Sequence, residues 1–408
     1  MDYPTHIYFI LSSMSYLQQY IPIANEFWNS HNIKSVFIKN VNKKSYTNVY
    51  NKKNIKKLEA VIKENSQSFD HIEFIDYKDN HNILKTKKIF FIVDGDFYGN
   101  RPKYLKMSLL HKINKNSYIV SLQENINFVW VYEHFIDHVN TCVFPNKALA
   151  DQYQTLSNKN VYLGNAKFDE ICTNKRQIYK KYNLSKKKKY CILLYPRLQL
   201  LKDNEIEPTK INNIINIFKS KRFSFIIKLR PKEKSTSSEH LKDFRGQKIV
   251  VSDDYPNQSI ELMSICNLAI IFSSSCLDEC IITKTPCIDL VIDKEYPDKL
   301  KYMSHKSVIR RIHKWYQVSN EDIEKQFKKL AKPGAPIFDQ LKEEYLFDIN
   351  TSSKKIVDYT LDNYQFGNDK IEDEIIDDVN DDIEIKEDVN ELEIEDEISE
   401  DVNDDIEI

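Results

Sequence analysis

The sequence predicts an α/β protein with two doubly wound parallel-sheet domains that face each other, followed by an acidic tail. Short apolar runs typical of strands recur in two series with helical segments between them, a pattern that favours parallel sheets covered by helices. A polar segment at 173–189, with four consecutive lysines at 186–189, separates the two series. Near residue 367 the composition becomes strongly acidic. We therefore expect an N-terminal domain over residues 1–170, a C-terminal domain over 171–366 and a tail over 367–408.

The first series of predicted strands contains seven apolar runs and the second contains five. The runs are three to six residues long, close to the length that buried strands usually have. The first series is residues 6–11, 35–38, 71–75, 88–93, 118–122, 141–144 and 161–163. The second is residues 190–195, 224–229, 248–252, 268–272 and 287–292. After residue 292 we expect helices, at 320–332 and at 353–361, with residues 351–353 as caps of the last one.

The charge of the chain is divided unevenly between its body and its tail. The 408 residues carry a formal net charge of −2. Residues 371–408 contain 20 Asp and Glu against one Lys, so residues 1–370 keep 58 Lys and Arg against 41 Asp and Glu. A basic body favours anionic ligands such as nucleotides, phosphorylated sugars, nucleic acid or a membrane surface.

The tail contains an acidic repeat. Residues 372–385 recur with two changes as residues 395–408. A segment this acidic and free of aromatic residues buries little apolar surface, so we expect disorder. The tail could screen the basic body, keep nucleic acid away or bind a basic partner, and it could also have no specific role.

Cysteine and glycine usage exclude several classes of site. The seven cysteines form no CxxC pair, which indicates reduced thiols, and Cys276 and Cys280 lack the clustered histidines of a zinc site.

The N-terminus has no signal-peptide pattern and no apolar stretch is long enough for a transmembrane helix, so we expect a cytoplasmic protein. With six glycines in all, the chain has no GxGxxG and no P-loop motif.

The serine-rich segment after residues 268–272 is the most informative part of the chain. An apolar strand there ends in three serines at 273–275 and a helix follows, which presents N–H groups and hydroxyls to an anion such as a pyrophosphate. Glu279 lies one helical turn beyond Ser275, about 6 Å along the axis, where it could reach a ribose hydroxyl. The alternative is a capping box of Ser275 and Asp278 with nothing bound.

Several motifs together resemble the GT-B superfamily. They are residues 161–169 (Val-Tyr-Leu-Gly-Asn-Ala-Lys-Phe-Asp), the Ser-Ser-Ser-x-x-x-Glu of residues 273–279, and Thr285-Pro286. Within the superfamily the chain is most similar to UDP-N-acetylglucosamine 2-epimerases, surface-polysaccharide transferases and CDP-glycerol glycerophosphotransferases. The resemblance covers about residues 88–170 and 190–295.

The resemblance implies that the C-terminal half holds the nucleotide of an activated donor. Glu279 matches the carboxylate that holds the ribose, and Ser274 and Ser275 match small residues that line the diphosphate. Basic residues at strand ends would neutralise the leaving group. The candidate substrate-binding residues are Arg197, Lys228, Arg230, Ser273, Ser274, Ser275 and Glu279.

The resemblance also implies that the N-terminal half binds the acceptor and carries the acidic catalytic residues. The candidates are Asp96, Glu124 and Glu133. Asp96 could instead only terminate its strand, and Glu133 could lie on an ordinary helix between the domains, together with His134 and His138. No third ligand accompanies these two histidines, so the helix is not a predicted zinc site.

Two departures from the epimerase pattern bear on the reaction. Arg230 and Pro196 stand where many relatives have histidines, and an arginine cannot act as a general base at neutral pH. We therefore expect a metal-independent glycosyltransferase without a cofactor, which uses a nucleotide-diphosphate-sugar donor, first of all a UDP-sugar. Its acceptor would be a glycan or a lipid-linked molecule of surface polysaccharide synthesis, and no specific nucleic acid is expected.

Three alternatives stay open. One is a UDP-N-acetylglucosamine 2-epimerase-like enzyme. A second is a CDP-polyol phosphotransferase, suggested by Asp-Lys-Glu-Tyr at residues 293–296. The third is a degenerate protein that binds a sugar nucleotide or an anionic partner without turnover.

Overall fold

The structure is a computed structural model in which part of the chain can be described. All statements below concern the described residues. These are residues 4–11, 16–39, 70–93, 112–123, 136–154, 157–169, 174–196, 198–229, 244, 246–251, 258–272, 274, 276–292, 305–344 and 350–368.

The first sheet has seven strands, all parallel, in the order β3-β2-β1-β4-β5-β6-β7. The chain runs outward from β1 to β3 and then resumes on the other side of β1 with β4, which makes the sheet doubly wound. The strands are β1 (His6–Leu11), β2 (Lys34–Lys39), β3 (Ile72–Asp76), β4 (Ile89–Val93), β5 (Tyr118–Leu122), β6 (Thr141–Phe144) and β7 (Asn160–Tyr162).

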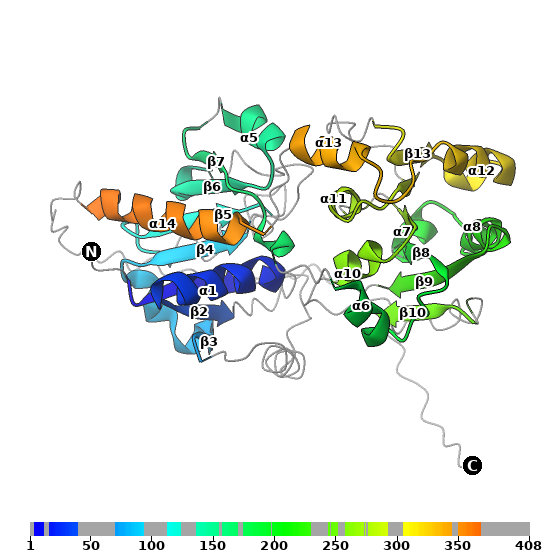
Figure 1. Cartoon of the computed structure of the whole chain (residues 1–408). Coiled ribbons are helices and arrows are strands. Elements are labelled where there is room, and N and C mark those ends of the chain that lie inside the picture. Colours follow the sequence, from blue (N-terminus) through cyan, green and yellow to red (C-terminus); the bar gives the residue numbers. More distant parts are fainter. Residues whose placement is uncertain are drawn as a thin grey trace, which may run out of the picture. The chain divides into compact units, whose positions relative to one another are not determined.

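Helices cover the first sheet because its strands are apolar on both faces. Ile7, Phe9 and Leu11 of β1 pack in one buried cluster with residues of α1 (Leu17–His31) and α14 (Ser352–Asn368). Figure 1 shows these two helices side by side on the same face. The intervening side chains of β1 belong to a second buried cluster, as alternation along a strand requires.

The second sheet has six parallel strands in the order β10-β9-β8-β11-β12-β13. It is also doubly wound, with the reversal between β8 and β11. The strands are β8 (Lys189–Leu194), β9 (Phe223–Leu229), β10 (Lys248–Val251), β11 (Leu268–Ile271), β12 (Cys287–Val291) and β13 (Ile309–His313). Two parallel-sheet α/β domains are therefore present, which confirms the predicted fold class.

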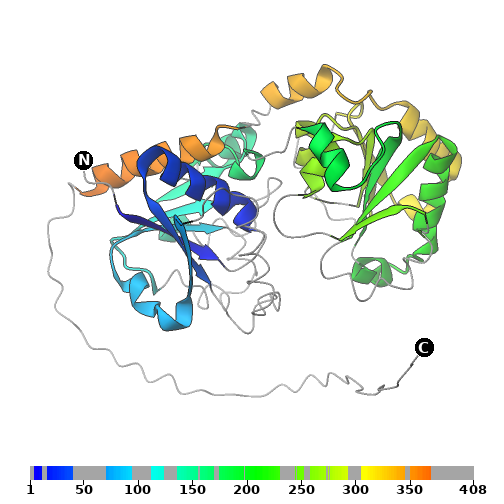
Figure 2. The same cartoon turned by 60° about the horizontal axis from the view of Figure 1, so that its bottom comes forward.

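Helices cover both faces of the second sheet, as Figure 2 shows. Residues of α8 (Thr209–Ser220) and α12 (Asn320–Lys328) belong to the buried cluster on one face. The other cluster includes residues of α6 (Lys175–Lys181), α10 (Gln258–Ser264), α11 (Leu277–Ile282) and α13 (Ile337–Glu344). The remaining helices are α5 (Lys147–Gln154), α7 (Leu198–Asp203), η2 (Tyr77–Asp79), η3 (His81–Lys85), η6 (Ile136–His138), η7 (Ala166–Phe168) and η11 (Trp315–Gln317).

Strand β13 and helix α13 are absent from the sequence-based prediction, which was wrong to expect only helices after residue 292. In β13 only Ile309 and Ile312 are buried and apolar, and two arginines lie between them. This sequence lacks the alternation of a half-buried strand. The strand forms at the edge of the sheet, where β12 supplies its only described partner.

A side chain far away in sequence caps the start of α14. The carboxylate of Asp169 accepts hydrogen bonds from the backbone N–H of Ser352 at 3.2 Å and of Ser353 at 2.5 Å. A carboxylate in this place satisfies N–H groups of the first turn and interacts favourably with the helix dipole. The structure thus shows a cap from a residue that follows η7, and the predicted cap within residues 351–353 stays a prediction.

Two compact units divide the chain, residues 1–366 and residues 367–408. The predicted boundary near residue 170 stays a prediction. The acidic repeat lies outside the described residues, so its predicted disorder stays a prediction as well. Within the described part of the chain, no helix combines the length and the apolar character needed to span a membrane.

Candidate functional site

The topology of the second sheet places a candidate site at the carboxyl ends of β8 and β11. From β8 the chain continues to β9 on one side, and it later returns to β11 on the other side. In doubly wound sheets the two chain segments leave such a reversal in opposite directions, which opens a crevice where ligands bind. Ser274 follows β11 at this edge, and Lys228 is the penultimate residue of β9.

Four polar or charged side chains act on one thiol at this edge. The pKa of Cys276 is raised to about 12, first by burial and then by the negative charge of Glu279. A hydrogen bond with Ser274 and the positive charges of Lys228 and Lys167 act in the opposite direction and lower it. Effects of this kind require short distances. Two cations, a carboxylate and a hydroxyl therefore lie around Cys276.

Glu279 is held in place by its helix and by an ion pair. It lies on α11 and its side chain is 6% exposed. Its Oε1 lies 3.8 Å from Nζ of Lys167, whose side chain is 11% exposed. Water screens such a pair less than a surface pair. The pair thus brings a residue that follows β7 of the first sheet to a residue on a helix of the second.

The short helix η7 positions Lys167. Gly164 adopts φ +90°, which glycine tolerates, and its N–H donates to the carbonyl of Phe144 at 3.2 Å. The side chain of Asn165 then accepts a hydrogen bond from the N–H of Lys167 at 3.1 Å and caps η7. The ammonium group of Lys167 also lies 4.7 Å from the ring centroid of Phe168. These contacts hold residues 164–168 in a defined turn.

The start of α11 is described from Cys276 onward, together with Ser274 before it. The residue before the helix is Cys276, one position after Ser275, and it makes no side-chain capping hydrogen bond. Instead, Ser274 Oγ accepts a hydrogen bond from the N–H of Cys276 at 3.3 Å. Asp278, the other member of the proposed box, is fully buried. Ser275 lies outside the described residues, so the capping-box alternative stays open.

The sequence-predicted site residues divide into two groups. Lys228, Ser274 and Glu279 are described, and they lie around Cys276 at the carboxyl edge. Their roles in binding remain predictions. The other predicted site residues lie outside the described residues, and their roles also remain predictions: Arg197, Arg230, Ser273, Ser275, Asp96, Glu124 and Glu133.

Lys167 was missed as a site residue by the sequence analysis. It lies within the motif at 161–169, which was interpreted only as part of a family resemblance. A lysine directly after a Gly-Asn turn was the available signal. Its proximity to Glu279, 112 positions later in the chain, is a tertiary feature that no local pattern contains.

The chain was compared with known families, curated proteins and solved structures. No protein-family model and no curated protein matches it. Among solved structures, it is similar to the UDP-GlcNAc 2-epimerase from Neisseria meningitidis bound to UDP-GlcNAc, with 13% identity, a TM-score of 0.58, and coverage of 88% of this chain and 100% of that one. The chain has the GT-B fold.

Two further structures support the GT-B fold. The wall teichoic acid polymerase TagF soaked with CDPG has 13% identity, a TM-score of 0.57 and 89% coverage of both chains. The UDP-GlcNAc 2-epimerase from Methanocaldococcus jannaschii has 13% identity, a TM-score of 0.55, and coverage of 87% of this chain and 99% of that one. Similarity at this level of identity establishes the fold, as the resemblance predicts, and leaves the reaction to be argued from the site.

The polar side chains at the carboxyl edge of the second sheet have the chemistry to bind a nucleotide. A buried carboxylate accepts hydrogen bonds from two vicinal hydroxyls, as in a ribose. Two lysine ammonium groups at this edge can neutralise the charge of a bound diphosphate. Within the described residues, no three His, Cys, Asp or Glu side chains are grouped to hold a metal ion. Metal independence stays a prediction.

The buried thiols predict a loss of stability at alkaline pH. Burial raises the pKa of Cys276 to about 12 and raises those of Cys191, Cys266 and Cys287 well above the usual 9.0. The folded chain therefore keeps these protons where the unfolded chain begins to lose them. The stabilisation is complete below pH 9, and we expect the free energy of unfolding to fall as the pH rises from about 9 toward 12.

Urea unfolding followed by circular dichroism from pH 7.5 to 10.5 measures this effect. Cys276→Ser removes one titrating thiol, so its free energy of unfolding is expected to depend less steeply on pH than that of the wild type. Equal slopes for the two proteins would contradict the assignment to Cys276.

Proposed function

We propose that the protein is a glycosyltransferase that moves a sugar from a nucleotide-diphosphate donor to a glycan or lipid-linked acceptor in surface polysaccharide synthesis. The observation that carries the proposal is the convergence of Lys228, Lys167 and Glu279 around Cys276, beside Ser274. It occurs at the edge of the sheet where α/β proteins bind ligands. The GT-B fold supports it.

Each of these side chains receives a role from its chemistry. Glu279 accepts hydrogen bonds from the ribose hydroxyls of the donor. Lys228 and Lys167 stabilise the negative charge that develops on the departing diphosphate. Ser274, with Ser273 and Ser275, lines the phosphate path, and Arg197 and Arg230 add positive charge that can bind phosphate bidentately.

Transfer also needs a base that removes the proton from the acceptor hydroxyl. We assign this role to one of Asp96, Glu124 and Glu133 on the N-terminal half. Asp96 and Glu124 come three and two residues after predicted strands of the first sheet, and a carboxylate with a raised pKa is suited to the task.

Solved structures with the same fold support pyrimidine nucleotides as the first candidates. One similar epimerase is described as bound to UDP-GlcNAc, and a Staphylococcus aureus protein, MnaA, as a co-structure with UDP. TagF is described with CDPG. We therefore propose a UDP-sugar as the donor and place a CDP-activated polyol second.

A sugar-nucleotide 2-epimerase is the second candidate function. It is favoured by the several epimerases among the similar structures. Arg230 and Pro196 in place of histidines speak against it, because neither can act as a base. A catalytically inactive protein that binds sugar nucleotides, with the acidic tail bound to a basic partner, is the alternative outside enzymology.

A thermal-shift panel with UDP, CDP, GDP and dTDP and their sugars tests the proposal. The true donor at a hundredfold excess over its Kd is expected to stabilise the folded protein by about 2.7 kcal/mol. Incubation with UDP-GlcNAc alone then separates the reactions, because epimerisation needs no acceptor and transfer does. Binding without any product would identify the inactive alternative, and no shift with any nucleotide would contradict the proposal.

A further inference from the structure

A second polar pocket lies at the opposite edge of the second sheet. It has a volume of about 440 Å³ and lies where β8 and β11 begin. The strands separate it from the candidate donor site by about 17 Å, the length of a six-residue strand. We call it the lysine pocket, after six of its lining residues: Lys175, Lys186, Lys187, Lys188, Lys189 and Lys284.

The lysine run at 186–189 is held in a defined turn. The N–H groups of Lys187 and Lys188 donate to the side-chain and backbone oxygens of Ser185, both at 3.3 Å. The N–H of Ser185 donates to the hydroxyl of Tyr190 at 2.9 Å. The turn is thus anchored to the start of β8, and its four lysines are exposed.

Most of the positive charge in the lysine pocket is uncompensated. No Asp or Glu lines it. Among the described residues, Lys284 pairs with Asp339 at 2.7 Å, while Lys175 and the four lysines at 186–189 make no ion pair. Five like charges around one cavity repel each other, and an anion in the cavity would relieve that repulsion.

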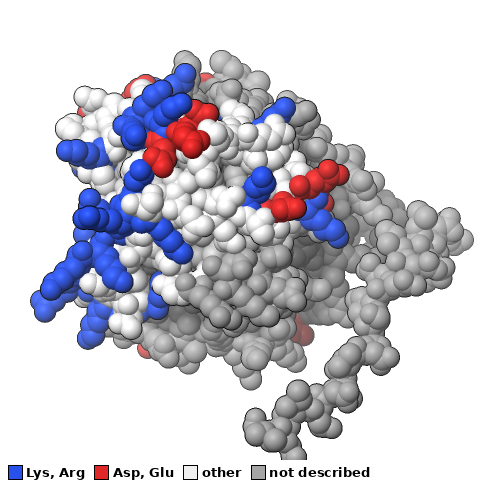
Figure 3. Space-filling view, turned by 90° about the vertical axis from the view of Figure 1, so that its right-hand side faces the viewer, with Lys and Arg blue, Asp and Glu red and all other residues white. Residues whose placement is uncertain are grey.

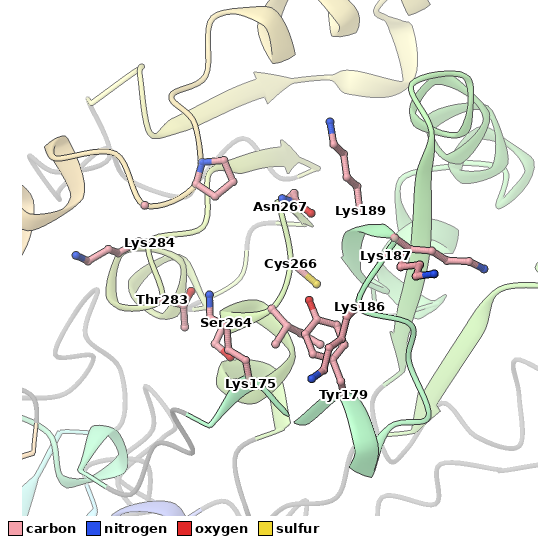
Figure 4. A pocket seen from close by; sticks show the side chains of 14 residues that line it. Lys175, Tyr179, Lys186, Lys187, Lys189, Ser264, Cys266, Asn267, Thr283 and Lys284 are labelled. Atoms are coloured by element: carbon pink, nitrogen blue, oxygen red, sulfur yellow. The ribbon is translucent and has the colours of Figure 1, made fainter. Parts of the chain in front are cut away.

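The figures agree with this distribution of charge. Figure 3 shows Lys and Arg side chains gathered along one edge of the face that carries the second sheet. Figure 4 shows the lysines around the rim of the pocket and Cys266 and Asn267 nearer its centre. Asn267 Oδ1 accepts a hydrogen bond from the N–H of Tyr190 at 3.2 Å. Its NH₂ group is therefore left to donate to a ligand.

We propose that the lysine pocket binds a small soluble anion that carries two or more linked phosphate groups. A lysine ammonium is a strongly hydrated point charge, so several lysines favour a ligand with several charges. The concave shape and limited volume suit a phosphate chain better than a flat membrane surface. This site is separate from the donor site, and the inference does not depend on the proposed function.

Isothermal titration of the full chain with inorganic tripolyphosphate tests the proposal. The triple variant Lys186→Gln, Lys187→Gln, Lys188→Gln is expected to bind tripolyphosphate about tenfold more weakly. Each exposed charge contributes part of the binding free energy, and the three together amount to about 1.4 kcal/mol, which corresponds to a tenfold change in affinity. The control variant Lys34→Gln, Lys85→Gln, Lys328→Gln removes the same charge at exposed positions elsewhere. It is expected to bind like the wild type. All six side chains are exposed, so both variants should fold, which circular dichroism checks.

Two further measurements locate the ligand and identify its source. Tripolyphosphate is expected to protect the lysines at 186–189 from acetylation, as read by mass spectrometry, and to leave Lys34 unprotected. The second measurement compares the binding of the protein to vesicles with and without anionic phospholipid. Equal loss of binding in both triple variants would overturn the proposal, since it would show nonspecific charge attraction. Vesicle binding that depends on the pocket, without tripolyphosphate binding, would overturn it in favour of a membrane surface.

Discussion

Glu279→Gln is expected to weaken the binding of UDP by about 10- to 100-fold. The carboxylate is replaced by an amide of the same shape, so charge-assisted hydrogen bonds to the ribose are lost, each worth about 1.5–3 kcal/mol. The side chain of Glu279 is 6% exposed and paired with Lys167, so water does not readily replace it. Isothermal titration with UDP measures the change.

Deoxygenated ligands make this test specific for the ribose. The wild type is expected to bind 2′-deoxy-UDP and 3′-deoxy-UDP more weakly than UDP, whereas Glu279→Gln should barely distinguish them. Comparing the two proteins with the three ligands isolates the contact between Glu279 and the ribose hydroxyls from other effects of the substitution. Glu261→Gln is the matched control, because Glu261 is also buried and paired with a lysine, Lys181, at 2.7 Å. Unchanged UDP affinity in Glu279→Gln would remove the ribose assignment.

Asp289→Asn is expected to lower the free energy of unfolding by about 3–5 kcal/mol, as removal of one partner of a buried ion pair does. Asp289 on β12 lies directly opposite Arg311 on β13. The side chains are 1% and 9% exposed, and Arg311 Nε lies 3.1 Å from Asp289 Oδ2. The substitution leaves a buried guanidinium without its carboxylate. Urea unfolding at pH 7.5 measures the loss.

Two controls separate charge from packing in this prediction. The double variant Asp289→Leu, Arg311→Met removes both charges and is expected to be much more stable than Asp289→Asn, because no buried charge is left unpaired. Lys325→Gln removes one partner of the exposed pair with Asp322, and no measurable change is expected. A double variant as unstable as the single one would contradict the explanation.

The same ion pair explains why β13 could not be predicted from the sequence. Two arginines interrupt its apolar residues, and by themselves they indicate an exposed segment. In the structure Asp289 on the neighbouring strand neutralises Arg311 and allows it to be buried. The other twelve strands were predicted, because each has an apolar run of its own.

The residues of the candidate site also divide into those that could be predicted from the sequence and those that could not. Lys228 and Ser274 were predictable, because they lie at strand ends and parallel strands bring their carboxyl ends to one edge. Glu279 was predictable because it lies one helical turn beyond the serines and matches the family resemblance. Lys167 was not, since its partner Glu279 lies 112 positions away. Asp169 likewise caps a helix that begins 183 residues later.

The sequence by itself determined the two series of strands, the helices between most of them, the opposite charges of body and tail, and the resemblance to the GT-B superfamily. These depend on local patterns of apolar and charged residues, which act over a few residues at a time. Only the tertiary structure decided the strand order with its reversal between β8 and β11, the pairing of Glu279 with Lys167, and the position of the lysine run at the rim of a pocket. These features depend on which distant segments are buried together, and that is a property of the whole folded chain.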